Sequence, residues 1–268
     1  MTPSQPPALT FNEYRVWLKK EFDYDSGEAA RNYYKVVVDR IHDFVRDSDF
    51  WALLLRELQE SHDTYFQDSR GYTLLTSLHP ELETKGYDAF LLKTYRWNVL
   101  NNPAFPAPPL EHGWTEPSNW YDTATDLVRT LLVVKYLDGV KFLTQRLADF
   151  CEARGVQYEV ALQARTEGYY AGHFRVRQVV EVVTQSDWKT RTIEPSVEIQ
   201  VSTQLQEVMR QTLHKFYETN RALPEQDPIA WQWDYASPEF SANYLGHILH
   251  YVEGKIMEIR DGQKVGGR

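Results

Sequence analysis

The stretch "DLVRTLLVVKYLDGVKFLTQRLADFCEARG", residues 126–155, decides the fold class of the chain. Its first part, residues 126–136, is rich in branched apolar residues, which favours a buried strand. Its second part, residues 138–155, has the apolar spacing of an amphipathic helix and ends at Gly155, a residue type that commonly terminates helices. A strand followed directly by a helix indicates that the centre of the chain mixes α and β structure.

Helical signals flank this unit on both sides. Residues 11–78 predict a helical region, and residues 85–100 predict one more helix that stops before Pro103. A last helix is expected at about 240–260. The centre continues with three expected strands, at about residues 156–164, 173–183 and 191–202. One helix is expected after them, at about residues 202–218. The expected division is an N-terminal helical region, a central mixed domain and a C-terminal helical extension, at residues 1–78, 79–222 and 223–268.

The helix predicted at residues 202–218 has a start signal and an apolar stripe. Ser202 or Thr203 could cap the helix, and Gln206 follows Thr203 at the three-residue spacing of a capping box. The spacing predicts that one face of the helix is buried, and that face consists of Leu205, Val208, Met209, Thr212, Leu213 and Phe216.

Composition excludes several classes of protein. The chain has 268 residues, of which 42% are hydrophobic, so it can bury a sizeable core. The formal net charge of −9 argues against a protein that coats nucleic acid by charge alone. Cys151 is the only cysteine, which excludes an internal disulfide and a cysteine zinc site. The N-terminus has no signal-peptide pattern and no apolar run reaches about 18 residues, so we expect a cytoplasmic protein without a membrane span.

Alternation along the strands places charged residues together on one side of the expected sheet. On the strand at residues 173–183, one face carries His173, Arg175, Arg177 and Glu181. On the strand at residues 191–202, Glu198 and Gln200 face one way, and Val197, Ile199 and Val201 face the core. From the pattern alone, two interpretations stay open for the polar side: a binding site or an ordinary solvated face.

Cations and a second acid lie elsewhere in the sequence. The expected helix at 85–100 carries a stripe at helical spacing that consists of Lys85, Ala89, Lys93 and Arg96. Such a stripe can hold a polyphosphate, although most such stripes are solvated surface. Asp126 begins the strand at 126–136, and together with Glu198 it would suit magnesium-assisted phosphoryl transfer.

Other catalytic patterns are missing from the sequence. It has no glycine-rich phosphate loop of the strand–GKS/T–helix type, no histidine cluster at metal spacing and no nucleophile elbow. Five of the scattered histidines are expected to pack or to lie on the surface, namely His42, His62, His214, His247 and His250.

Three motifs resemble, in order and spacing, the synthetase domain of the RelA/SpoT family. They are "DLVRTLLVVKYLDGV", "EGYYAGHFRV" and "SVEIQVSTQLQEVMRQTLHKFYE". The resemblance covers about residues 80–220 and is nearest to single-domain small alarmone synthetases and their toxic branch. It implies an α+β, nucleotidyltransferase-like fold with a mixed central sheet of about five strands, flanked by helices and extended by helices at both ends. It also makes residues 79–222 the expected catalytic domain.

The resemblance implies a reaction and a role for each site residue. The reaction transfers the β,γ-pyrophosphate of ATP to the 3′-hydroxyl of a guanine nucleotide. The ring of Tyr169 would stack on the base of the acceptor, with His173 near its phosphates and Arg175 and Gln200 beside it. Glu198 and Asp126 would be the catalytic acids and would hold Mg²⁺. The cations that would bind ATP are Lys85, Lys93, Arg96 and Arg129.

The sequence departs from the family pattern on the donor side. Glu83 stands where the family usually has an arginine, Ala89 where it has a serine, and Leu131 where it often has another arginine. Arg129 is close enough in sequence to supply that missing cation. An alternative is therefore a synthetase fold that binds a nucleotide or a protein without catalysis. The partners that we expect are ATP and GDP or GTP, and the alternatives are tRNA as acceptor, an antitoxin protein and a homo-oligomer.

Overall fold

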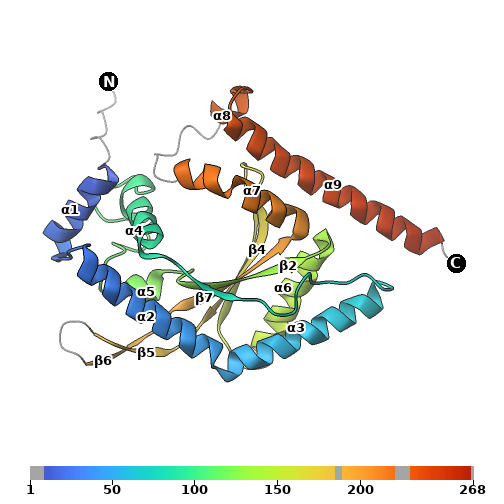
Figure 1. The fold of residues 1–268 in the computed structure, drawn as a ribbon, viewed down its shortest axis with the longest axis horizontal. Coiled ribbons are helices and arrows are strands. Elements are labelled where there is room, and N and C mark those ends of the chain that lie inside the picture. The colour runs from blue at the N-terminus through green and yellow to red at the C-terminus, as the bar shows by residue number, and fades with distance from the viewer. Residues whose placement is uncertain (1–8, 185–188, 221–229, 267–268) are drawn as a thin grey trace.

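The computed structural model describes residues 9–184, 189–220 and 230–266, and it forms helices around a central mixed sheet (Figure 1). The five-stranded sheet has the order β1-β2-β7-β4-β3. Helices precede the sheet in the chain, cover it and follow it. The α+β fold class predicted from the sequence is confirmed.

The N-terminal region consists of three helices, α1 (Phe11–Phe22), α2 (Glu28–Arg46) and α3 (Asp49–Asp68). Thr10 and Glu13 form a capping box at the start of α1, and Ser48 caps α3 through the backbone N–H of Trp51. Their buried faces, for example Leu18, Ile41 and Leu58, join one hydrophobic core with the sheet. The helical prediction is confirmed as far as Asp68, and it is wrong for residues 69–78, which form turns and extended chain.

The sheet combines one parallel pair with antiparallel neighbours. The strands are β1 (Leu82–Thr84), β2 (Val128–Val134), β3 (Tyr158–Ala164), β4 (Tyr170–Arg177) and β7 (Ser196–Thr203). Strands β2 and β7 run parallel, whereas β1–β2, β4–β7 and β3–β4 are antiparallel. Helix α6 (Leu137–Glu152) follows β2 directly and packs against the sheet, so the fold of the opening stretch is as predicted.

Two predicted strands are wrong in extent, because each is divided between two sheets. Strands β5 (Val180–Val183) and β6 (Thr190–Ile193) form a separate two-stranded sheet. The break lies where Gln178 donates its backbone N–H to the carbonyl of Pro195, at 3.0 Å. Proline cannot donate to a ladder, so it interrupts the sheet at this point.

The same break corrects the position of Glu181. Strand β5 packs against α2, where Tyr33 donates to the carbonyl of Val183 at 3.1 Å and Arg40 donates to the carbonyl of Glu181 at 3.5 Å. Glu181 therefore does not share a sheet face with His173 and Arg175.

The predicted helix at 85–100 is shorter and begins later. Helix α4 spans Tyr87–Tyr95, with Gly86 at its N-cap, and a π-helical segment η1 (Arg96–Leu100) follows it. Lys85 lies before α4 in extended chain, with its backbone N–H bonded to the carbonyl of Leu127 at 2.9 Å. The helical stripe that included Lys85 is therefore wrong, because this residue is held by the sheet edge. A short helix, α5 (Trp120–Thr123), leads into β2.

The C-terminal part contains α7 (Gln204–Asn220), α8 (Ala230–Trp233) and α9 (Pro238–Gly266). The Thr203 cap is confirmed, because its hydroxyl accepts the backbone N–H of Gln206 at 3.3 Å. The predicted stripe of α7 is partly wrong: Met209 is buried, but Val208 is 56% exposed and Thr212 is also exposed.

Packing between helices explains that error. Helix α9 lies against α7 (Figure 1), so the buried positions of α7 include the polar residues Gln206 and Glu207. The side chains of Leu213 and Phe216 lie outside the described residues. No helix in the described parts of the chain combines the length and the apolar character that a bilayer crossing requires.

Candidate active site

One face of the sheet carries a row of alternating charges that crosses all five strands. The directly paired residues are Glu83 on β1, Arg129 on β2, Glu198 on β7, Arg175 on β4 and Glu159 on β3. Residues that are paired across strands point to the same side of a sheet. Glu83 and Arg129 lie 3.0 Å apart, and Arg175 lies 3.7 Å from Glu198 and 3.9 Å from Glu159. The row places acids and cations side by side on one surface.

Glu198 is the buried end of a hydrogen-bonded chain on this face. The Glu198 side chain is 9% exposed, and its Oε1 lies 2.9 Å from Nδ1 of His173. Nε2 of His173 lies 3.1 Å from the hydroxyl of Tyr169, and the amide of Gln200 donates to the same hydroxyl. The structure thus brings together four residues predicted from the "EGYYAGHFRV" and "SVEIQV" motifs. Their roles stay predictions.

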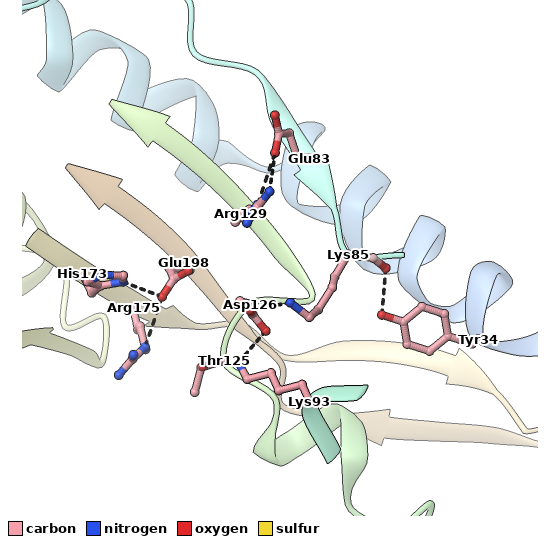
Figure 2. Close-up of polar contacts among 10 residues, drawn as sticks. All are labelled: Tyr34, Glu83, Lys85, Lys93, Thr125, Asp126, Arg129, His173, Arg175 and Glu198. Carbon is pink, nitrogen blue, oxygen red and sulfur yellow. Dashed lines mark hydrogen bonds and ion pairs between the residues drawn. The ribbon is translucent and has the colours of Figure 1, made fainter. Parts of the chain in front are cut away.

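Two lysines converge on Asp126 at the start of β2 (Figure 2). Nζ of Lys85 lies 2.9 Å from Oδ2 of Asp126, and Nζ of Lys93 lies 2.8 Å from Oδ1. The position of Lys85 is fixed in turn by Tyr34, whose hydroxyl donates to the Lys85 carbonyl at 2.9 Å. Lys93 also reaches the hydroxyl of Thr125 at 3.4 Å. Lys85, from the segment before α4, and Lys93, from α4 itself, therefore both contact the carboxylate of Asp126.

Electrostatics tie this cluster to Glu198. Burial acts to raise the pKa of Asp126, but the charges and hydrogen bonds of Lys93 and Lys85 outweigh it and lower the pKa to about 2. Burial lowers the pKa of Lys93, and the negative charges of Asp126 and Glu198 both oppose that change. The Lys93 ammonium is therefore stabilised by the charges of both acids. Its ammonium also lies 4.6 Å from the centroid of the Trp97 ring, within cation–π range.

The two acids suit a magnesium ion that is shared with a substrate. Within the described residues, no group of three or more His, Cys, Asp or Glu side chains is arranged to hold a metal by itself. Mg²⁺ is usually held by one or two carboxylates together with substrate phosphates and water. Both polar contacts of Glu198 are made through Oε1, so Oε2 has no ion pair or hydrogen bond among the described residues. The oxygens of Asp126 are shared with the lysines, so the donor set fits a metal that arrives with a triphosphate.

The ring of Tyr169 is half-buried on the loop before β4. Burial, followed by the charge of Glu198, raises the pKa of Tyr169 to about 12, so the phenol is neutral and can donate a hydrogen bond. The guanidinium of Arg165 lies 5.6 Å from the centroid of this ring. Sequence reasoning missed Arg165, because it lies in a loop without periodicity. The tight turn, in which the Arg165 N–H bonds to the Tyr169 carbonyl at 3.0 Å, is what brings the two together.

Three further cations were predicted for the site, and the structure places them in different surroundings. Arg96 is in the π-helical segment, one position after the end of α4. Arg129 is paired with Glu83, and Glu83 contacts no lysine in the ion pairs of the described chain. The Nε atom of Arg175 is buried, has no hydrogen-bond partner among the described residues and lies 3.7 Å from Glu198.

No protein-family model matches the chain, and no curated protein sequence matches it. Solved structures do align with it. Small alarmone synthetase 2 from Bacillus subtilis is 14% identical with a TM-score of 0.46, and the alignment covers 78% of this chain and 97% of that protein. A GTP pyrophosphokinase family protein from Streptococcus pneumoniae is 15% identical with a TM-score of 0.49, covering 88% and 93%. Small alarmone synthetase 1 from Bacillus subtilis is 12% identical with a TM-score of 0.49, covering 81% and 99%.

At these scores and identities the likeness assigns no activity, which has to be inferred from the side chains of this chain. Among solved structures, the chain is similar to small alarmone synthetases and GTP pyrophosphokinase family proteins.

Proposed function

We propose that this protein is a pyrophosphokinase, which transfers the β,γ-pyrophosphate of ATP to the 3′-hydroxyl of a guanine nucleotide. One observation carries the proposal. Lys85 and Lys93 both form ion pairs with Asp126, and the charge of Lys93 also interacts with that of Glu198, the acid that is hydrogen-bonded to His173. The two lysines and Asp126 lie at the start of β2, and Glu198, His173 and Tyr169 follow along the strands from there. Such a set can hold a polyphosphate, activate a hydroxyl and position a base.

The donor half would bind the triphosphate through the lysines. In the free protein the single carboxylate of Asp126 pairs with both ammonium groups, which leaves one positive charge in excess, and the two lysine side chains are 14% and 24% exposed. ATP phosphates would share these cations with Asp126, so the lysines need not be reoriented from elsewhere. Preorganised cations of this kind stabilise charge without a reorganisation cost during the reaction. Arg129 would add a further cation at the edge of the site.

The acceptor half would position the nucleotide through Tyr169. Stacking of a base on an aromatic ring contributes about 1–3 kcal/mol. The tyrosine hydroxyl is already held by His173 and Gln200, so the ring has a defined orientation. Arg175, whose buried Nε has no hydrogen-bond partner among the described residues, would contact the acceptor phosphates from the neighbouring strand.

The chemical step follows from these positions. The 3′-oxygen of the acceptor would attack the β-phosphorus of ATP. A new O3′–Pβ bond forms, and the bond breaks between Pβ and the oxygen that bridges the α- and β-phosphorus. AMP leaves with that oxygen, and the carboxylate of Glu198 would accept the proton of the hydroxyl. When bound by Asp126 and Glu198, Mg²⁺ would supply charge neutralisation for the triphosphate. Water exclusion would come from the burial of Glu198, whose side chain is 9% exposed.

A free guanine nucleotide suits the site better than tRNA. Small alarmone synthetase 1 from Bacillus subtilis has been solved with pppGpp and with AMPCPP, but at TM-scores of 0.44 and 0.39 these structures carry no argument for this chain. The preference comes from its own charges. The net charge is −9, and the cations Lys85, Lys93 and Arg175 are paired with acids instead of forming a basic patch.

The second candidate is a nucleotide-binding module without catalysis, which the Glu83–Arg129 ion pair favours, since it occupies a donor-side cation. An antitoxin partner and a homo-oligomer stay predictions.

ATP labelled at the γ position, incubated with GDP, with GTP or with bulk tRNA, tests the proposal. Label in the guanine nucleotide supports it, label in tRNA assigns the alternative acceptor, and binding of ATP without any transfer supports the module.

A further inference from the structure

The loop that presents Tyr169 is a tight turn between β3 and β4. The N–H of Gly168 bonds to the carbonyl of Arg165 at 3.0 Å, and Gly168 has a φ of +75°, a conformation that favours glycine. The strands on both sides are paired up to Ala164 and Tyr170. Within the turn, Thr166 and Tyr169 have no strand partners, so other contacts must set their positions.

Helix α9 touches this turn backbone to backbone. A Cβ atom added to Gly168 would lie 2.3 Å from the carbonyl oxygen of Asn243, and one added to Gly246 would lie 2.3 Å from the carbonyl oxygen of Gly168. Both positions therefore require glycine, because any side chain would separate the helix from the turn. The contact joins two segments that are about 80 residues apart in the sequence.

His247 bonds to the turn from both ring nitrogens. Nε2 lies 2.8 Å from the carbonyl oxygen of Thr166, and Nδ1 lies 2.8 Å from the hydroxyl of Tyr170. Since a carbonyl only accepts, Nε2 carries a proton and donates to Thr166. His250, one turn further along α9, stacks on the Tyr170 ring with centroids 3.6 Å apart and an interplanar angle of 3°. His247 therefore contacts the chain on both sides of Tyr169, and His250 adds a second contact to Tyr170.

The other end of α9 is anchored on the body of the protein. Arg260 is 4% exposed, donates to the hydroxyl of Tyr65 at 2.6 Å and pairs with Asp138 at the start of α6. Near the turn, the amide of Gln206 on α7 donates to the carbonyl of Gly246 at 3.4 Å. Helix α9 is thus fixed against α3, α6 and α7, and it can act as a rigid support.

We propose that α9 positions the acceptor-binding ring, with His247 as the positioning residue. Thr166 and Tyr170 are held by His247, and Tyr169 lies between them, with its hydroxyl fixed by Gln200 and His173. The position of the ring is therefore set from two sides, by the sheet and by α9. The inference rests on the proposed function where it is tested by enzyme kinetics. Where it is tested by amide hydrogen exchange, it rests on the structure alone.

Kinetics of variants test the role. His247→Ala removes two hydrogen bonds to the turn, and we expect the KM of the guanine nucleotide to rise about tenfold while the KM of ATP stays within about twofold. His247→Gln, which can still donate to the Thr166 carbonyl, should recover part of this loss. Ile248→Ala is the matched control, because Ile248 is the next residue and is 55% exposed. An unchanged nucleotide KM in His247→Ala, or an equal rise of both KM values, overturns the inference.

Amide hydrogen exchange tests the same role without activity. In His247→Ala and in Gly246→Ala, residues 165–172 should exchange faster, whereas Ile248→Ala should match the wild type. Equal protection of this segment in all four proteins overturns the inference, even if the enzyme is active. If the wild type shows no transfer to any acceptor but the segment loses protection as expected, the proposed function fails and the support of the turn by α9 stands.

Discussion

Glu83 and Arg129 form an ion pair across β1 and β2, with Oε2 of Glu83 3.0 Å from Nη2 of Arg129. Both residues are directly paired in the sheet, and the next residue in the same row is Glu198. The family that the motifs resemble usually has an arginine at the position of Glu83. If the proposed donor site is correct, Glu83 pairs with Arg129, a cation that would otherwise be available to ATP.

Removal of that acid should strengthen ATP binding. Glu83→Gln frees Arg129, and because the two side chains of the pair are 39% and 63% exposed, we expect the KM of ATP to fall by only about two- to fivefold. Glu81→Gln, which removes the same charge two residues away, is the matched control. Steady-state kinetics at fixed acceptor concentration measure the effect. Weaker ATP binding in Glu83→Gln would mean that the pair supports the donor site instead of restraining it.

Glu198→Gln should abolish transfer and keep the fold. The substitution preserves the shape of the side chain but removes the proton acceptor and a carboxylate for Mg²⁺, so we expect kcat to fall by at least about 10²-fold. The loss of charge next to Arg175 should cost only about 1–2 kcal/mol of unfolding free energy. Rates of AMP release and thermal unfolding measure the two effects. A variant that retains wild-type turnover contradicts the assignment of Glu198.

Tyr169→Ala should weaken acceptor use far more than ATP binding. Loss of a stacking ring is worth about 1–3 kcal/mol, which corresponds to roughly 5- to 150-fold in the KM of the guanine nucleotide. Tyr169→Phe keeps the ring and loses the bonds to His173 and Gln200, so its defect should be smaller. Separate titrations of ATP and acceptor measure both. Equal losses for the two substrates would show that the loop is not an acceptor platform.

Asp126 should stabilise the fold above about pH 4 and lose that effect below it. Its pKa falls from the ordinary 3.8 to about 2 in the folded protein, so the folded state holds the proton less tightly than the unfolded state does. The contribution, about 2 kcal/mol, is complete above the unfolded pKa and disappears as the pH falls through the folded pKa. Urea unfolding of the wild type and Asp126→Asn at pH 5, 4, 3 and 2 measures this.

The stability difference between these two proteins should therefore shrink from pH 4 to pH 2. Asp39→Asn, in an exposed pair with Lys35 on α2, is the control for a general acid effect. A difference that is constant over this range would show that Asp126 is not held by the lysines.

Much of the site could be predicted from strand alternation. The period of two places His173 and Arg175 on one side of β4 and Glu198 and Gln200 on one side of β7, and the structure shows both sets on the same face. Alternation does not show where a strand changes sheet, because Glu181 continues the pattern after the break at Pro195 and Gln178. The convergence of Lys85 with Lys93 was expected from a helical stripe, but it arises from the edge of the sheet.

Contacts of the C-terminal helix could not be predicted from sequence. Gly168 and Gly246 have no side chains that would signal a partner, and their contact depends on the path of the chain between them. His247 has the spacing of an ordinary packing histidine, and only the tertiary contact shows that both its nitrogens are used.

The most direct test of the central claim is the identity of the products of a single turnover with ATP, GTP and Mg²⁺. Pyrophosphate transfer predicts one AMP for each GTP consumed, and a product that carries two additional phosphates on its 3′-oxygen by mass spectrometry and ³¹P NMR. Formation of ADP with a singly phosphorylated acceptor, or of ADP and free phosphate, would contradict the account, because attack would then occur at the γ-phosphorus.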